Sequence, residues 1–174
     1  MKNFKFIILA LSIIGFTACN DNEDPIPDPP EPTVSVVINE MLPRNTENGA
    51  DQDGEYDDWI ELYNYSSEAI DISGYYLSDV QTDITKWSFP DGTTIPGFGY
   101  LIVWADDDTT QVGLHTNFKL SATNGETVIF HSDEEVLVDM VSFPPATEEK
   151  SWARKPNGTG DFEWSTPTFN GAND

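Results

Sequence analysis

Residues 100–105 read YLIVWA, a continuous apolar run. A run of this length is typical of a buried β-strand and is too short for an ordinary helix. Elsewhere apolar residues recur at every second position, as at Val36 and Ile38 and again at Ile60 and Leu62. This alternation predicts strands that bury one face.

Turn signals separate these short runs. They are Asp53-Gly54, Ser73-Gly74, Asp91-Gly92, Pro96-Gly97, Asn124-Gly125 and Asn157-Gly158. Asn-Gly and Asp-Gly pairs reach the positive φ angles that tight hairpins require. No stretch of the domain shows the 3.6-residue period of an amphipathic helix. Residues 34–174 are therefore predicted to form one all-β sandwich of roughly eight or nine strands.

The amino terminus has the pattern of an export signal. Lys2 and Lys5 precede an apolar stretch at 6–16, which is too short to span a bilayer as a helix. Small residues then lead into Cys19, the single cysteine of the chain. The segment resembles a bacterial lipobox, which predicts that residues 1–18 form a signal peptide and that Cys19 carries acyl chains, palmitate among them.

Residues 19–33 are expected to form a linker. Five acids and five prolines in 20–33 leave too little apolar surface for folding, and the prolines favour an extended spacer. The acids directly after Cys19 resemble the export signal of surface lipoproteins in Bacteroidetes-type bacteria. We therefore expect an outer-membrane lipoprotein anchored by its lipid and exposed at the cell surface, with a periplasmic location as the alternative.

The net charge of the chain limits the classes of partner that are expected. The chain carries 31 acids and 8 bases, and the part that follows residue 18 has a formal net charge of −25. Binding to nucleic acid requires clustered Lys and Arg to displace counterions, so a nucleic-acid partner is not expected. A single cysteine also excludes an intrachain disulfide and a cysteine zinc cluster.

Several ordered motifs extend through the domain. They are VINEMLP (37–43), DWIELYN (58–64), IDISGYYLSD (70–79), WSFPDGTTI (87–95), GYLIVW (99–104), NFKLS (117–121), GETV (125–128), TPT (166–168) and GAN (171–173). Taken in this order, they resemble the bacterial form of the lamin tail domain. The resemblance implies an immunoglobulin-like β-sandwich without enzymatic activity of its own.

The search for catalytic groups yields weak candidates. His131-Ser132-Asp133 has the residue types of a hydrolase triad, but sequence neighbours seldom converge in that way, so a surface turn is favoured. His115 is interpreted as a structural or surface residue. Glu40 and Glu61 lie in expected strands and could act as acid and base in glycoside hydrolysis, but hydrogen bonding to backbone amides or Arg154 is the favoured interpretation. We expect no enzyme.

A loop rich in acids is the best chemical signal. Residues 51–58 read DQDGEYDD, and Asp51, Asp53 and Asp57 could supply carboxylate oxygens to calcium around the turn at Gly54. The spacing is not that of an EF-hand. The alternative is a solvated acidic loop, and no other cofactor is expected.

Two binding functions remain open. The leading hypothesis is a non-catalytic, surface-tethered module for protein interaction or envelope structure, with an unidentified protein partner. The alternative is a glycan-binding module of a surface uptake system, possibly dependent on calcium. Trp87 and Trp164 lie beside expected turns, so they are the candidates for sugar stacking, although core packing is favoured for any single tryptophan.

Overall fold

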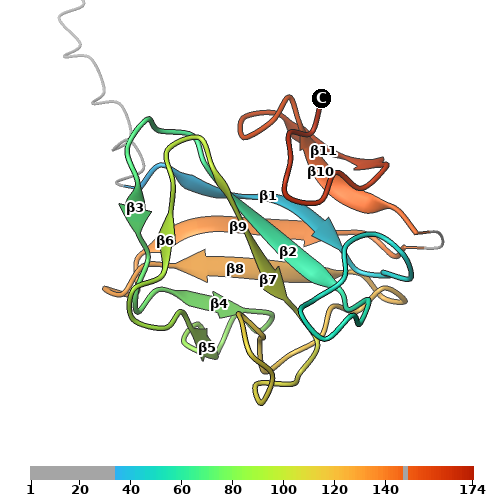
Figure 1. Cartoon of the computed structure of the whole chain (residues 1–174), viewed down its shortest axis with the longest axis horizontal. Coiled ribbons are helices and arrows are strands. Elements are labelled where there is room, and N and C mark those ends of the chain that lie inside the picture. Colours follow the sequence, from blue (N-terminus) through green and yellow to red (C-terminus); the bar gives the residue numbers. More distant parts are fainter. Residues whose placement is uncertain (1–33, 147–148) are drawn as a thin grey trace, which may run out of the picture. The chain divides into compact units, whose positions relative to one another are not determined.

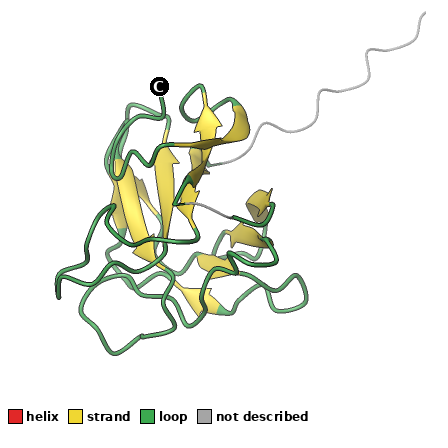
Figure 2. Ribbon diagram, turned by 90° about the vertical axis from the view of Figure 1, so that its right-hand side faces the viewer, coloured by secondary structure: helices red, strands yellow, loops and turns green. Residues whose placement is uncertain are grey.

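The computed structural model describes residues 34–146 and 149–174. Cys19, the signal segment and the linker lie outside this part of the chain. In Figure 2 the described residues form strands and loops without a helix. Accordingly, none of them belongs to a helix long and apolar enough to cross a membrane.

The described residues contain eleven strands. They are β1 (Val36–Leu42), β2 (Trp59–Asn64), β3 (Ile70–Asp71), β4 (Tyr76–Ser78), β5 (Trp87–Ser88), β6 (Thr94–Ile95), β7 (Tyr100–Trp104), β8 (Glu126–His131), β9 (Leu137–Phe143), β10 (Ser151–Lys155) and β11 (Asp161–Ser165). This exceeds the expected eight or nine because β3, β5 and β6 have two residues each, too few to produce a hydrophobic period.

Two larger sheets make up the sandwich (Figure 1). The first has the strand order β11-β10-β1-β2-β7, and the second has the order β5-β4-β8-β9. The short strands β3 and β6 pair separately. Neighbouring strands are antiparallel in every pair. The predicted all-β sandwich is thus confirmed.

The main core lies between the two sheets. Buried apolar side chains come from the first sheet (Val36, Ile38, Met41, Ile60, Leu62, Val103) and from the second (Leu77, Trp87, Val128, Phe130, Val141, Phe143). Each fully buried side chain of this size contributes about 1.5–3 kcal/mol relative to an exposed one. Ile60 and Leu62 stand two positions apart in the sequence because both side chains of β2 point into this core.

A β-bulge at Asn39 interrupts the alternation of β1. Ile38 pairs with Leu62 while Glu40 pairs with Glu61, so Asn39 is an extra residue in β1. Strict alternation from Ile38 would direct Glu40 into the main core. Because the bulge shifts the alternation by one residue, Met41 faces the core and Glu40 faces the outer side of the sheet.

A second, smaller core covers the outer face of the first sheet. It consists of Leu42, Trp59 and Trp104, with Phe169 from the C-terminal segment packed against them. The Phe169 ring lies edge-on to Trp59, with 5.5 Å between ring centroids. The C-terminal segment therefore closes a face of the sheet that would otherwise meet water.

Candidate functional site

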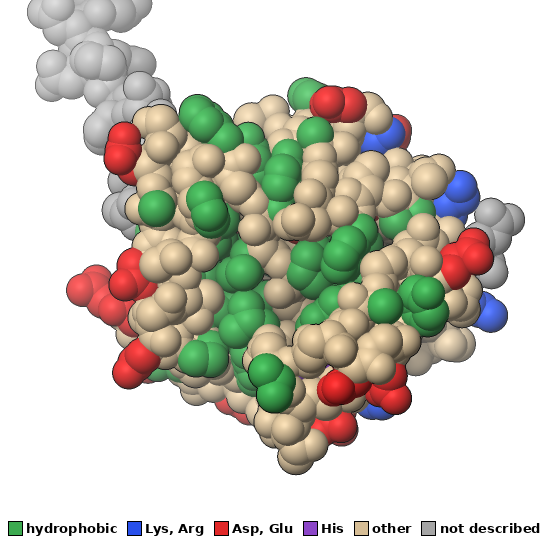
Figure 3. All heavy atoms as spheres, viewed as in Figure 1, with side chains coloured by type: hydrophobic (Ala, Val, Ile, Leu, Met, Phe, Trp, Pro, Cys, Tyr) green, Lys and Arg blue, Asp and Glu red, His purple; other side chains and the backbone are tan. Residues whose placement is uncertain are grey.

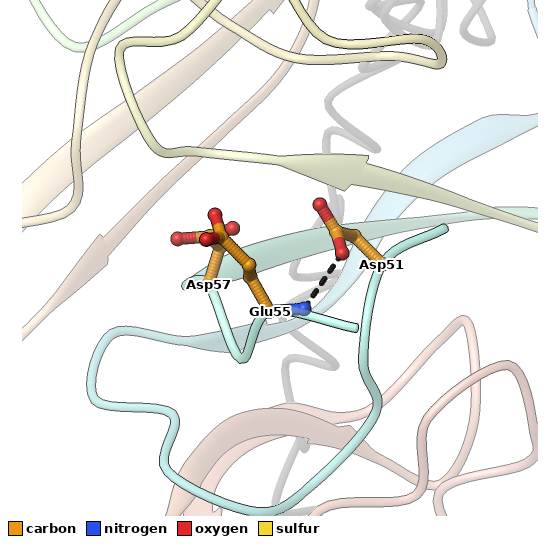
Figure 4. A group of neighbouring side chains, drawn as sticks. All are labelled: Asp51, Glu55 and Asp57. Carbon is orange, nitrogen blue, oxygen red and sulfur yellow. Dashed lines mark hydrogen bonds between the residues drawn. The ribbon is translucent and has the colours of Figure 1, made fainter. Parts of the chain in front are cut away.

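Three carboxylates converge in the loop between β1 and β2. One carboxylate oxygen from each of Asp51, Glu55 and Asp57 lies within 4.8 Å of the others (Figure 4). The structure thus brings together two of the three predicted metal ligands. Asp53 is exposed and lies outside the group, and Glu55 takes its place.

Hydrogen bonds to Asp51 shape this loop. Its Oδ1 accepts the N–H groups of Asp53 at 2.9 Å and of Glu55 at 2.8 Å. The N–H of Asp51 in turn donates to the carbonyl oxygen of Glu55 at 2.9 Å. Gly54 completes the turn at a φ of 85°. An aspartate that accepts backbone N–H groups two and four residues ahead folds a tight loop around its own carboxylate.

In and beside the β1–β2 loop, three buried oxygen atoms lack a hydrogen-bond partner among the described residues. They are Asp51 Oδ2, Asp57 Oδ2 and Gln111 Oε1. Gln111 belongs to the loop between β7 and β8, and its Nε2 donates to Glu55 Oε2 at 3.1 Å. A buried carboxylate or amide oxygen normally has at least one partner.

Burial raises the pKa of Asp57 above its ordinary value, and the negative charges of Asp106, Asp51 and Glu55 raise it further. The nearby His115 opposes this shift in pKa. Asp106 is the first of three consecutive aspartates, 106–108, which form a second acidic segment. The two acidic segments therefore lie at the same end of the sandwich.

His115 is a buried structural residue. Its Nδ1 pairs with Asp106 Oδ2 at 2.7 Å, and its Nε2 lies 2.9 Å from the amide nitrogen of Gln52. Its ring also stacks on Trp104. Both ring nitrogens are thus occupied, which leaves neither of them to take a proton from a nucleophile.

The environment of His131 differs from the one predicted from the sequence. It ends β8 and is buried, so the prediction of a surface turn is wrong at this position. Burial lowers the pKa of its imidazole. Ser132 Oγ accepts the N–H of Val136, so this serine helps to close the β8–β9 hairpin.

Glu40 and Glu61 lie under the C-terminal segment and the β10–β11 turn. Glu40 accepts from the N–H of Thr168 at 3.0 Å, and its other oxygen lies 2.6 Å from the Thr168 hydroxyl. Glu61 accepts from Asn39 Nδ2 at 2.9 Å. Arg154 contacts neither glutamate; it pairs with Asp139 instead. Backbone hydrogen bonding of Glu40 agrees with the favoured interpretation, whereas the suggested role of Arg154 is wrong.

Burial also controls the charge of both glutamates. Loss of solvent raises the pKa of Glu61 to about 8, with a further contribution from the charge of Glu40. The pKa of Glu40 is likewise raised by burial. The Thr168 hydroxyl lies 2.6 Å from both Glu40 and Asn173 Oδ1, and it has one hydrogen for two acceptors. The hydroxyl can therefore donate to only one of these two oxygens at a time.

The two tryptophans proposed for sugar stacking have different environments. Trp87 is 9 % exposed and packs edge-on against Phe89 in the main core, so its predicted exposure is wrong. Trp164 on β11 is half-buried and packs against Trp152. Trp87 follows a turn, but strand β5 directs it inward between the two sheets, whereas Trp164 lies within β11.

The fold places the protein in the class of immunoglobulin-like β-sandwiches. Within that class, the sequence pattern of the lamin tail domain matches residues 29–145. The chain therefore belongs to the lamin tail domain family, which is non-enzymatic. No curated protein sequence matches the chain. The family match ends before β10, so the segments that cover Glu40 and Glu61 follow the matched region.

Proposed function

We propose that this protein is a non-catalytic lipoprotein module, tethered at the cell surface through Cys19, that serves protein interaction or envelope structure. The observation that best supports the absence of catalysis is the burial of both candidate acid–base groups. Glu40 and Glu61 are 0 % exposed and lie beneath the C-terminal segment. A glycosidase needs its two carboxyl groups in an open cleft on either side of the bond that it cleaves.

The sequence supports the tether. An acyl chain contributes about 0.8 kcal/mol for each buried methylene, and stable anchoring needs more than one chain. The acidic domain has no electrostatic attraction to anionic lipid, so a covalent anchor is the way to retain it at a membrane. The proline-rich residues 20–33 would hold the domain up to roughly 40 Å from the anchor if fully extended.

The charge distribution suggests what kind of partner the domain binds. Figure 3 shows hydrophobic side chains gathered in the middle of one face and charged side chains around its margin, most of them acidic, with Lys and Arg mainly on the right. An apolar centre with a polar rim is the usual anatomy of a protein interface. We propose a protein partner whose contact surface carries Lys and Arg around an apolar centre, because opposite charges speed and orient association.

Three measurements on cells test the tether. Mass spectrometry of the purified protein should find acyl chains on Cys19, and Cys19→Ala should release the domain from the membrane fraction. Protease added to intact cells should remove the domain if it is surface-exposed. An unacylated Cys19 thiol in the mature protein would contradict the anchor, and protection from protease would place the domain in the periplasm.

Cross-linking on intact cells followed by affinity purification tests the interaction role. The expected result is a reproducible protein partner whose recovery falls as salt is raised, because rim charges are screened. Reproducible hydrolysis of a polysaccharide by the purified protein would contradict the absence of catalysis.

A glycan-binding role is the second candidate, and the partial exposure of Trp164 favours it. Aromatic rings that keep one face in solvent can stack on sugars. A glycan array that compares wild type with Trp164→Ala tests this role. Binding that disappears in the variant supports it, whereas an array without any bound polysaccharide removes it.

A further inference from the structure

We propose that the β1–β2 loop binds one Ca²⁺ ion through Asp51, Glu55 and Asp57, with the side-chain carbonyl of Gln111 as a fourth ligand from the β7–β8 loop. The site is independent of the tether and of any partner. It rests on three features of the described residues: the spacing of the oxygens, their lack of hydrogen bonds, and the two loops that supply them.

The spacing suits calcium. Calcium binds oxygens at about 2.3–2.6 Å, so two oxygens on opposite sides of one ion are separated by about 5 Å. The three carboxylate oxygens lie within 4.8 Å of one another, a spacing that fits a single coordination sphere. Magnesium demands about 2.0–2.1 Å and near-ideal octahedral geometry, whereas calcium accepts irregular sets of six to eight oxygens.

Asp51 provides an independent indication of a ligand. Its side chain is 9 % exposed, its Oδ1 is bonded to two backbone N–H groups, and its Oδ2 has no partner among the described residues. Figure 4 shows the carboxylate of Asp51 on the same side of the loop as those of Glu55 and Asp57. A buried, charged oxygen without a hydrogen bond is costly, and a cation would compensate for it.

Asp57 and Gln111 share this feature. Asp57 Oδ2 and Gln111 Oε1 are also buried without a partner in the described part of the chain. Gln111 Nε2 donates to Glu55 Oε2 at 3.1 Å, so the amide group that carries Oε1 adjoins the carboxylates. Carboxylate and amide oxygens are the ligands that calcium prefers. One ion could thus satisfy all three atoms.

The aspartate turn at Asp71 differs from the turn at Asp51 in its exposure to solvent. Asp71 also accepts the N–H of a residue two positions ahead, Ser73, at 2.8 Å. Its side chain is exposed, and the remaining hydrogen bond comes from the Ser73 hydroxyl. An ordinary aspartate turn in this protein is therefore solvated, unlike the turn at Asp51. This makes Asp71 a suitable control, because its substitution removes the same charge.

Isothermal titration calorimetry with CaCl₂ tests the site. The mature protein is purified with its own N-terminus and freed of metal with a chelator. We expect one Ca²⁺ per chain with a dissociation constant of about 0.1–1 mM, the range of extracellular calcium modules. Asp57→Asn should weaken binding about tenfold or more. Asp71→Asn should leave it unchanged.

Controls keep the test decisive. Circular dichroism checks the fold of each variant, and Glu55→Gln replaces Asp57→Asn if the latter does not fold, because Glu55 is exposed. Magnesium should bind more weakly than calcium. The proposal fails if wild type shows no heat at about 10 mM calcium. It also fails if Asp71→Asn weakens binding as much as the loop variants, which would indicate general attraction to an acidic surface.

Discussion

Glu40 and Glu61 are direct cross-strand partners on β1 and β2, and both side chains are completely buried. Like charges in this position destabilise a sheet, and burial of two carboxylates would add a large desolvation cost. Burial raises the pKa of Glu61 to about 8, so a proton on Glu61 at neutral pH removes the repulsion within the pair, and burial raises the pKa of Glu40 as well. The pair therefore links the stability of the domain to pH.

The first prediction concerns Glu61 and pH. In the unfolded chain Glu61 ionises near 4.5, whereas in the folded protein its pKa is about 8. Between these values the folded state holds a proton that the unfolded state has released, so the free energy of unfolding decreases as pH rises through this window. In wild type we expect a loss of the order of a few kcal/mol from pH 5 to pH 8.

Urea denaturation of wild type and Glu61→Gln at both pH values checks this prediction. Because glutamine does not titrate, the variant should lose much less stability than wild type between pH 5 and pH 8. Asp58, whose pKa burial raises to about 6, still titrates in both proteins and accounts for a residual slope. Equal pH dependence in the two proteins would show that Glu61 is ionised in the folded state.

The second prediction concerns the C-terminal segment. Thr168 contacts Glu40 through its N–H and its hydroxyl, and that hydroxyl also contacts Asn173. Thr168→Val keeps the shape but removes the hydroxyl, so it should lower the free energy of unfolding by about 1–3 kcal/mol. Thr166→Val, at an exposed position, is the matched control and should have little effect. Chemical denaturation measures both, and equal effects would contradict the assigned role.

The third prediction concerns the junction of the two sheets. Asp139 Oδ2 on β9 accepts the N–H of Ile38 at 2.9 Å and pairs with Arg154 at 3.0 Å. Asp139→Ala would leave both donors partly buried without that partner, so we expect a loss of about 1–3 kcal/mol in thermal or urea denaturation. Asp133→Ala, an exposed change of the same type, should be nearly neutral. A neutral Asp139→Ala would show that water replaces the carboxylate.

The fourth prediction separates backbone strain from packing. Gly49 and Gly92 both have positive φ angles, 79° and 82°. A Cβ at Gly49 would lie 2.4 Å from the Phe169 ring, whereas a Cβ at Gly92 would meet nothing within 4 Å. Alanine at Gly92 should cost about 1–2 kcal/mol for the left-handed backbone, and alanine at Gly49 should cost more. Equal melting temperatures would show that Phe169 moves aside freely.

Much of the fold follows from local patterns. The alternation at Ile60 and Leu62 predicted β2 correctly, and YLIVWA predicted β7. The bulge at Asn39 could not be predicted in this way. Two of its side-chain partners, Asn157 and Gly158, lie more than a hundred positions further along the chain. No local period contains that information.

The candidate site was predicted in part. The composition of residues 51–58 identified the loop, and Asp51 and Asp57 do converge. Asp53 lies outside the group of converging carboxylates, because its backbone N–H bonds to Asp51 and its side chain is exposed. Gln111 was missed, because it comes from another loop and nothing in its own neighbourhood marks it as a ligand.

The order of apolar and turn residues, by itself, determined that this protein is an all-β sandwich, because strand periodicity and turn chemistry act over a few residues. The ordered motifs, rather than this periodicity, resemble the lamin tail domain. The tertiary structure alone decided the charge and accessibility of its acids. Glu61, Asp57 and Asp71 all carry a carboxyl group, yet Glu61 is buried beneath the C-terminal segment, Asp57 lies among like charges and Asp71 is solvated. Solvation and electrostatic environment depend on what the distant chain packs against, which no local pattern records.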